Sequence, residues 1–303
     1  MTATAATSAP IPAPPPRRRF SPFPRLRRLP GAAGVSAAVI GVLALMAVGA
    51  LFVAPLDTRS VFLDQVLRSP SFEHPMGTDT LGRDLFTRVL HGMRTSFGIS
   101  IIAAVCAAVI GAAVGLVAGS VGRRFDAVVM RGIDVLSSQN HFLFGILILV
   151  LSRPLVGPAG AIFLSVGITH WTSVARIVRG EVLALREQKF VAASVNAGAD
   201  RRHLARRHFL PHVFPAAALG FVLLVPHAIF HEAGYSFLGL GMPPESASLG
   251  NLLADSQSSL LSGGWWASLF PGLVILLASM AVGTLGEWWR DRRNPRWRSE
   301  LQL

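Results

Sequence analysis

The sequence is poor in three residue types: it has one cysteine, Cys106, one lysine, Lys189, and one tyrosine, Tyr235. A single cysteine excludes a disulfide bond within the chain. A phosphate-binding P-loop needs a Gly-Lys pair followed by Ser or Thr, whereas the residue before Lys189 is Gln188. We therefore expect the chain to hydrolyse no nucleotide and to hold no cofactor of its own.

Charged residues are also scarce, because Asp, Glu, Lys and Arg make up 15% of the 303 residues, against about 25% in an average soluble domain. Mean hydropathy is +0.51. A membrane-spanning helix needs about 20 consecutive apolar residues to cross roughly 30 Å of hydrocarbon. Six runs without a charged residue are candidates for such spans: 29–56, 95–122, 135–152, 154–175, 208–231 and 256–286.

These runs predict helices rather than strands. Every backbone N–H and C=O group must be paired inside a bilayer, and a helix pairs its own groups. A membrane β-barrel would show short segments that alternate apolar and polar residues, whereas residues 103–119 are apolar on every face. We expect an all-α integral membrane protein with six transmembrane helices.

The net charge of +12 comes mostly from arginine, which supplies 27 of the 28 basic residues. Nucleic-acid binding would explain such a charge, but the positive-inside rule explains its distribution better. With the N-terminus in the cytoplasm, 22 basic residues fall in cytoplasmic segments and six fall outside. We expect a multi-pass protein with both termini in the cytoplasm and no nucleic-acid partner.

The chain divides into three parts. Residues 1–28 are rich in Ala, Pro and Arg, which predicts a disordered cytoplasmic tail whose arginines contact anionic lipid. Residues 29–290 form the membrane domain. Residues 291–303 form a cytoplasmic C-terminal end.

Polar segments join the predicted spans. The segments 57–94 and 232–264 are expected outside the cell membrane, and Arg123–Asp134 is expected in the cytoplasm. The third span then begins near residue 135. A turn at Ser152–Gly160, which contains two prolines, joins the third span to the fourth.

Three glycines recur at every fourth position of the second span: Gly111, Gly115 and Gly119. Small residues at this spacing form a flat strip on which another helix can approach closely. The alternative is that glycine is simply common in membrane helices. We favour a packing role for the strip.

Residues 187–211 form a cytoplasmic segment with helical character. The helical pattern breaks at Gly198-Ala199-Asp200. Gly198 is suited to end one helix and Asp200 to cap the next. A helix–turn–helix at the membrane can bind a soluble partner, whereas the alternative is an ordinary basic loop between two spans.

His227, His231 and Glu232 lie at the outer end of the fifth span. Ionisable groups in a span often mark a translocation pathway, although these three could equally meet water at the interface. His231-Glu232 begins a HExxH zinc motif, but position 235 is Tyr235 and the second zinc ligand is missing. The sequence therefore predicts no metal site and no enzyme.

The outer segment contains Gly77, Asp79, Gly82, Arg83 and Asp84. Asp79, Arg83 and Asp84 could contact a soluble protein outside the membrane, or they could form a local ion pair that shapes the loop. We favour the second interpretation.

One stretch resembles the EAA signature of bacterial ABC importer permeases. That signature is Glu-Ala-Ala, three residues, Gly, nine residues, Ile, one residue and Leu-Pro. Phe190–Gly198 followed by Leu210-Pro211 matches it at the glycine and at the Leu-Pro pair. Ala192 stands where the signature has Glu, and His208 stands where it has Ile.

Further stretches resemble the C-type subunits of the dipeptide, oligopeptide and nickel permeases in particular. They occur in order along roughly residues 31–298: His74–Asp84 with Gly92–Ser96, Glu232–Gly241, Leu249–Leu253, and Trp265 with Phe270–Gly272.

The resemblance implies the type I ABC importer permease fold and a role as the membrane-spanning subunit of a peptide importer in the bacterial cytoplasmic membrane. The implied partners are a homologous B-type permease, two ATP-binding subunits that hold ATP and Mg, and an extracytoplasmic substrate-binding protein. The residues that would couple to the ATPase are Ala192, Ala193, Ser194, Gly198, Ala199, Asp200, Leu204, Leu210 and Pro211. Alternatives are import of nickel or another small solute, and a membrane scaffold that transports nothing.

Overall fold

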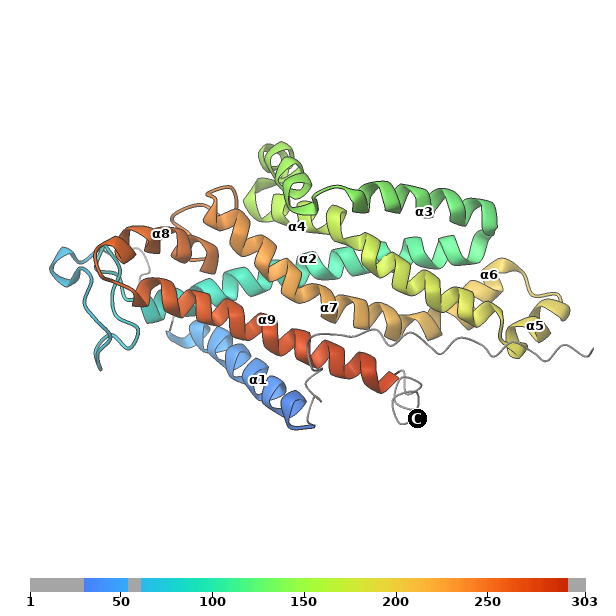
Figure 1. Ribbon diagram of the computed structural model, residues 1–303, viewed down its shortest axis with the longest axis horizontal. Helices are drawn as coiled ribbons and strands as arrows, with labels where there is room; N and C mark the ends of the chain where they lie inside the picture. Colours follow the sequence, from blue (N-terminus) through green and yellow to red (C-terminus); the bar gives the residue numbers. More distant parts are fainter. Residues whose placement is uncertain (1–29, 54–60, 294–303) are drawn as a thin grey trace, which may run out of the picture.

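The computed structural model describes residues 30–53 and 61–293. The expected tail 1–28 and residues 294–303 of the expected C-terminal end lie outside the described residues. Within the described ranges the regular secondary structure is helical, apart from one isolated β-bridge between Thr78 and Asp84, and loops such as 66–84 and 238–248 join the helices. The long helices lie side by side in an elongated bundle (Figure 1).

Long helices alternate along the chain with shorter helices and turns. In chain order they are α1 (Pro30–Val53), the 3-10 turn η1 (Leu63–Gln65), α2 (Leu85–Val121), α3 (Arg123–Ser138), α4 (His141–Arg186), α5 (Lys189–Asn196), α6 (Arg201–His203), the π-helical turn η2 (Leu204–Phe209), α7 (Leu210–Phe237), α8 (Leu249–Leu261) and α9 (Trp266–Arg293).

Helix α2 forms the centre of the bundle. It packs most extensively on α4 and also contacts α7, while α1 packs on α9 at the edge. Its inward face carries small side chains such as Ala103 and Ala107, which are fully buried. Small residues let helix backbones approach closely where lipid leaves little hydrophobic driving force for association.

The helices begin where short polar side chains can accept from free backbone N–H groups. Asp84 accepts a hydrogen bond from Thr87 N at 2.8 Å at the start of α2. Asn140 accepts from Phe142 N at 3.1 Å at the start of α4. These caps fix the helix starts that the hydropathy pattern leaves open.

Five described helical stretches are long and apolar enough to cross a membrane: Gly31–Gly49, Leu85–Val121, His141–Arg186, Arg201–Phe237 and Trp266–Arg292. The sequence predicts six spans, and the third and fourth of these fall mainly within the single element α4. The count of six and the placement of both termini in the cytoplasm remain predictions.

The predicted boundaries around the third span are wrong. Helix α3 continues to Ser138, and the next helix begins only at His141 because Asn140 caps it. In place of a turn over Ser152–Gly160, helix continues on both sides of one non-helical residue, Gly157, with φ 73° and ψ 175°. Glycine adopts this backbone without a steric cost, so the two parts of α4 can run in different directions (Figure 1).

Other polar segments are more helical than the sequence predicts. The segment 57–94 includes the start of α2, the segment 232–264 contains the last turns of α7 and all of α8, and Arg123–Asp134 lies in α3. Asp126 binds α3 to α4, because its carboxylate accepts from Arg179 Nη2 at 2.6 Å. This hydrogen bond from Arg179 holds the pKa of Asp126 below its usual value.

The two ends of the bundle differ. We call the end that carries α8 and residues 61–84 the α8 end, and the end that carries α5 and α6 the α5 end (Figure 1). Each end holds one of the segments that the sequence singles out.

Candidate functional site

The helix–turn segment, residues 187–211, connects α4 to α7 at the α5 end. Helix α5 ends at Asn196, and Gly198 follows with φ +85°. Asp200 caps the next helix, where its carboxylate accepts a hydrogen bond from His203 N at 2.8 Å. The tight turn between two helices is therefore built from a glycine in the left-handed region and an aspartate N-cap.

His208 connects the two helical parts of this segment. Its Nε2 lies 2.9 Å from Ser194 Oγ, and its ring centroid lies 5.7 Å from that of Phe190. Beneath them Val191 and Phe209 are buried in one hydrophobic cluster. The histidine at the signature's Ile position thus makes a polar link across the turn.

The surface of the helix–turn segment is open. An open cavity of about 440 Å³ is lined by Gly198, Asp200 and neighbouring residues. Among the expected coupling residues, Ser194, Ala199 and Leu204 are half-buried, and the exposed ones are Ala192, Ala193, Gly198, Asp200, Leu210 and Pro211. Four arginines are also exposed on this segment: Arg201, Arg202, Arg206 and Arg207.

The glycine strip of α2 lies against the second part of α4. A Cβ on Gly111 would overlap the carbonyl oxygen of Trp171, and one on Gly115 would overlap the carbonyl oxygen of Ala175. A Cβ on Gly119 would lie 2.8 Å from Val182 Cβ. The strip therefore allows a close contact between two helices of the same chain.

The three ionisable residues that the sequence places at the outer end of the fifth span, all in α7, lie in different surroundings. Glu232 is fully buried and accepts a hydrogen bond from Ser236 Oγ at 3.0 Å. His231 is buried on another side of the helix beside His170 of α4, and His227 is exposed. The alternative that all three meet water at an interface is wrong for His231 and Glu232.

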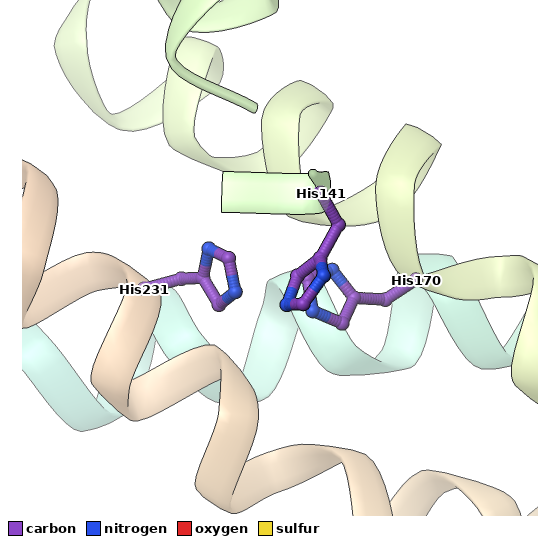
Figure 2. Close-up of side chains that lie close together, drawn as sticks. All are labelled: His141, His170 and His231. Carbon is purple, nitrogen blue, oxygen red and sulfur yellow. The ribbon is translucent and has the colours of Figure 1, made fainter. Parts of the chain in front are cut away.

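His231 belongs to a cluster with His141 and His170 (Figure 2). No sequence pattern indicates this cluster, because the three histidines come from separate segments and no zinc-motif spacing relates them. Their positions become neighbours only when α4 folds back on itself and packs on α7.

At the α8 end, Asp79 is the centre of a buried ion-pair network. Its carboxylate accepts from Arg83 Nε at 2.7 Å and from Arg88 Nη1 at 2.6 Å. Arg88, which is 2% exposed, also lies 3.1 Å from Asp255 of α8. Asp84 caps α2 and contacts His74 Nδ1 at 2.9 Å.

This network supports the interpretation that the charges of residues 77–84 shape the loop. Gly77 and Gly82 both have positive φ, near 75°, which favours glycine. The sequence does not identify Arg88 or Asp255 as members, because no spacing rule relates Asp79 to Arg88 in the first turn of α2 or to Asp255 far along the chain. The one available signal was that Arg88 lies in the same outer segment, 57–94, as Asp79.

Comparison with known proteins gives a family match. The family described as binding-protein-dependent transport system inner membrane component matches residues 111–299. The match includes the helix–turn segment and the glycine strip.

Individual relatives extend the match toward the N-terminus. The chain is 38% identical over 254 residues to the dipeptide transport system permease protein DppC of Bacillus subtilis, covering 84% of this chain and 78% of the relative. It is 36% identical over 262 residues to the oligopeptide transport system permease protein OppC of the same organism, covering 86% and 84%. A putative peptide permease of Brucella suis is 35% identical over 243 residues, 80% of each chain.

Proposed function

Because the chain belongs to the family of binding-protein-dependent transport system inner membrane components, we propose that it is a membrane-spanning subunit of an ATP-driven importer of dipeptides or oligopeptides in the bacterial cytoplasmic membrane. The observation that carries the proposal is its 38% and 36% identity to two permeases whose names specify dipeptide and oligopeptide transport. The similarity covers at least 78% of each of these chains.

The chain supplies the membrane path, and its partners supply the energy and the cargo. A homologous B-type permease completes the pathway, two ATP-binding subunits hold ATP and Mg, and a substrate-binding protein delivers peptide from outside. In this arrangement the α5 end faces the cytoplasm and the α8 end faces outward. The exposed arginines at the α5 end support this orientation, because basic residues concentrate on the cytoplasmic side.

The helix–turn segment is the part that couples to the ATPase. Its turn at Gly198 and Asp200 is exposed, while Phe209 is buried at the start of α7. Arg201–Phe237 is continuous helix, so a displacement of the turn is carried into the membrane as a rigid-body movement. Because Ala192 replaces the signature Glu, the contact with the ATPase depends on the shape of the helix–turn segment and on its exposed arginines.

Uptake of a labelled dipeptide tests the cargo. A strain that lacks this chain but keeps its neighbouring transport genes should lose ATP-dependent uptake, and the full-length chain should restore it. Uptake of radioactive nickel in the same strains is the second arm of the experiment. Restoration of nickel uptake without dipeptide uptake would replace the peptide assignment with the nickel alternative.

Cross-linking tests the coupling segment independently of the cargo. A cysteine at Ala199 in a Cys106→Ala background should cross-link to a cysteine in the ATPase groove, and the yield should change when ATP binds. Arg123→Cys in α3 is the comparison site, because it is also exposed. Efficient ATP-dependent cross-linking from Arg123→Cys alone would move the coupling surface to α3.

A further inference from the structure

Three histidine rings point toward one another inside the bundle (Figure 2). His141 begins α4, His170 lies in the second part of α4, and His231 lies in α7. The ring centroids of His170 and His231 are 4.5 Å apart, and each lies 5.3 Å from that of His141. One ring nitrogen from each histidine lies within 4.8 Å of the other two.

Hydrogen bonds fix which nitrogen of His170 carries the proton. Thr169 Oγ1 lies 2.8 Å from the carbonyl oxygen of Ser165, so the hydroxyl donates its only hydrogen to that acceptor. Thr169 Oγ1 also lies 2.7 Å from His170 Nδ1, and it can only accept there. The proton of neutral His170 is therefore on Nδ1, and its Nε2 presents a lone pair.

A second chain of hydrogen bonds orients His231 in the same way. Its Nδ1 lies 2.9 Å from the Tyr235 hydroxyl, which lies 3.0 Å from Ser165 Oγ. Ser165 Oγ donates at 2.8 Å to the carbonyl oxygen of Gly145, an obligatory acceptor. Ser165 Oγ has one hydrogen, which we assign to the shorter contact, at Gly145, rather than to the Tyr235 hydroxyl 3.0 Å away. With that assignment Tyr235 donates to Ser165 Oγ, and His231 Nδ1 donates to Tyr235. His231 Nε2 then also presents a lone pair.

The lone pair on His170 has no partner within the described residues. The Nε2 atom of His170 is buried without a hydrogen bond, and the residue is 8% exposed. A buried acceptor without a partner carries a free-energy cost, because it has lost its hydrogen bond to water. Packing of the rings alone would leave that cost in place, whereas a cation bound between the three nitrogens would remove it.

A cavity of about 410 Å³ lies beside the cluster and is lined by His141, His170 and His227 among others. His141 is exposed at the first position of its helix, so its side chain can move toward the two buried histidines. Arg176 also lines the cavity, but its guanidinium lies 3.0 Å from the Asp134 carboxylate, which offsets its charge.

We propose that His141, His170 and His231 form a binding site for one divalent transition-metal ion, of the kind that imidazole prefers, such as Zn²⁺ or Ni²⁺. Three histidine ligands leave one coordination position open, and here that position faces the cavity. Because the three ligands are neutral, the open position favours water or a negatively charged oxygen ligand. The proposal does not depend on peptide import.

Thr169 and Tyr235 act on the metal through the histidines. Each accepts a hydrogen bond from the Nδ1–H of one ligand and so fixes the tautomer and the ring orientation. Loss of such a partner lowers metal affinity by about 10–100-fold in known sites. Thr169→Val and Tyr235→Phe are therefore expected to weaken binding by about 10–100-fold.

Zinc titration of the full chain in lipid nanodiscs, purified with a tag that contains no histidine, tests the site. We expect one ion per chain, detected by calorimetry and by metal analysis after dialysis. His141→Ala should remove this binding without unfolding the protein, because His141 is exposed. Titration with Co²⁺ should give visible absorption bands that disappear in the same variant.

His212→Ala and Thr172→Val are the matched controls. His212 is an exposed histidine on the same helix as His231, and Thr172 lines the cavity on the same helix as Thr169. Neither change should alter zinc affinity. Absence of zinc binding in the wild type would overturn the site. Zinc affinity equal to that of the wild type in both His141→Ala and Thr169→Val would also overturn it.

Discussion

At the α8 end the acidic and basic side chains lie against one another, whereas at the α5 end the basic side chains are exposed. Asp79 and Arg88 are 3% and 2% exposed and bind each other directly. None of the four arginines of the helix–turn segment has an ion-pair partner among the described residues: Arg201, Arg202, Arg206 and Arg207. Charges that satisfy each other stabilise a loop, while exposed charges of one sign remain available to another molecule.

The comparison predicts different consequences of mutation at the two ends. Changes at the α8 end should reduce the stability of the chain itself. Changes at the α5 end should leave the chain folded and reduce transport that depends on a partner protein. Four predictions test this difference, from the largest expected effect on stability to the smallest.

Arg88→Met should destabilise the protein by about 3–5 kcal/mol, because it leaves buried Asp79 with one of its two arginines. The measurement is the thermal unfolding midpoint of the purified chain in detergent. Arg94→Met is the control, because Arg94 is an exposed arginine on the same helix and should change stability by less than about 0.5 kcal/mol. Equal unfolding midpoints for Arg88→Met and Arg94→Met would show that the ion-pair network of Asp79 does not stabilise the protein.

Gly115→Leu should cost about 1–3 kcal/mol or more, because the new side chain has to displace the α4 backbone at Ala175. The yield of folded protein and its unfolding midpoint report this. Gly98→Leu on the same helix is the control, since nothing lies within 4 Å of a Cβ at Gly98. Tolerance of Leu at both positions would mean that α2 and α4 do not need their close contact.

Gly198→Val and Gly239→Val place the same strain at opposite ends. Both glycines have positive φ, +85° and +74°, with nothing within 4 Å of an added Cβ. The strain is about 1–2 kcal/mol at each position. We expect membrane insertion to survive in both variants and dipeptide uptake to fall only in Gly198→Val. Normal uptake in Gly198→Val would place the ATPase contact elsewhere, for example at Arg123–Arg131.

Asp126→Asn should have the smallest effect, about 1 kcal/mol, because Asp126 and Arg179 are only partly buried. The pKa of Asp126 is lowered in the folded protein. The ion pair therefore stabilises the folded protein at pH values above the unfolded pKa of about 3.9. That contribution is lost as pH falls through the lower folded pKa. Unfolding midpoints measured from pH 7 to 3 should therefore fall less steeply at the acid end in the variant than in the wild type.

Local signals in the sequence predicted the features that depend on neighbouring residues. Gly198 and Asp200 act within one turn of chain, so their cap roles follow from residue type and spacing. The spacing of Gly111, Gly115 and Gly119 likewise places them on one helix face. The partner of that face, the second part of α4, depends on which helices pack together and was not predictable from spacing.

The α4 boundaries show where hydropathy is insufficient. A charge-free run defines where chain can enter lipid, but it does not distinguish a turn from a helix with one non-helical glycine at Gly157. Asn140 was the local signal that would have placed the start of α4 correctly, because an Asn side chain readily accepts hydrogen bonds from the free N–H groups at a helix start.

The sequence by itself determined that the chain is helical and apolar enough for a membrane, because composition and period act over one element at a time. It also determined the turn between α5 and α6. Only the tertiary structure decided that Arg88 meets Asp79 and Asp255, and that His141, His170 and His231 meet one another. The contact of Arg88 with Asp255 and the histidine cluster join residues far apart along the chain, and they exist only because α2, α4, α7 and α8 pack with particular faces together.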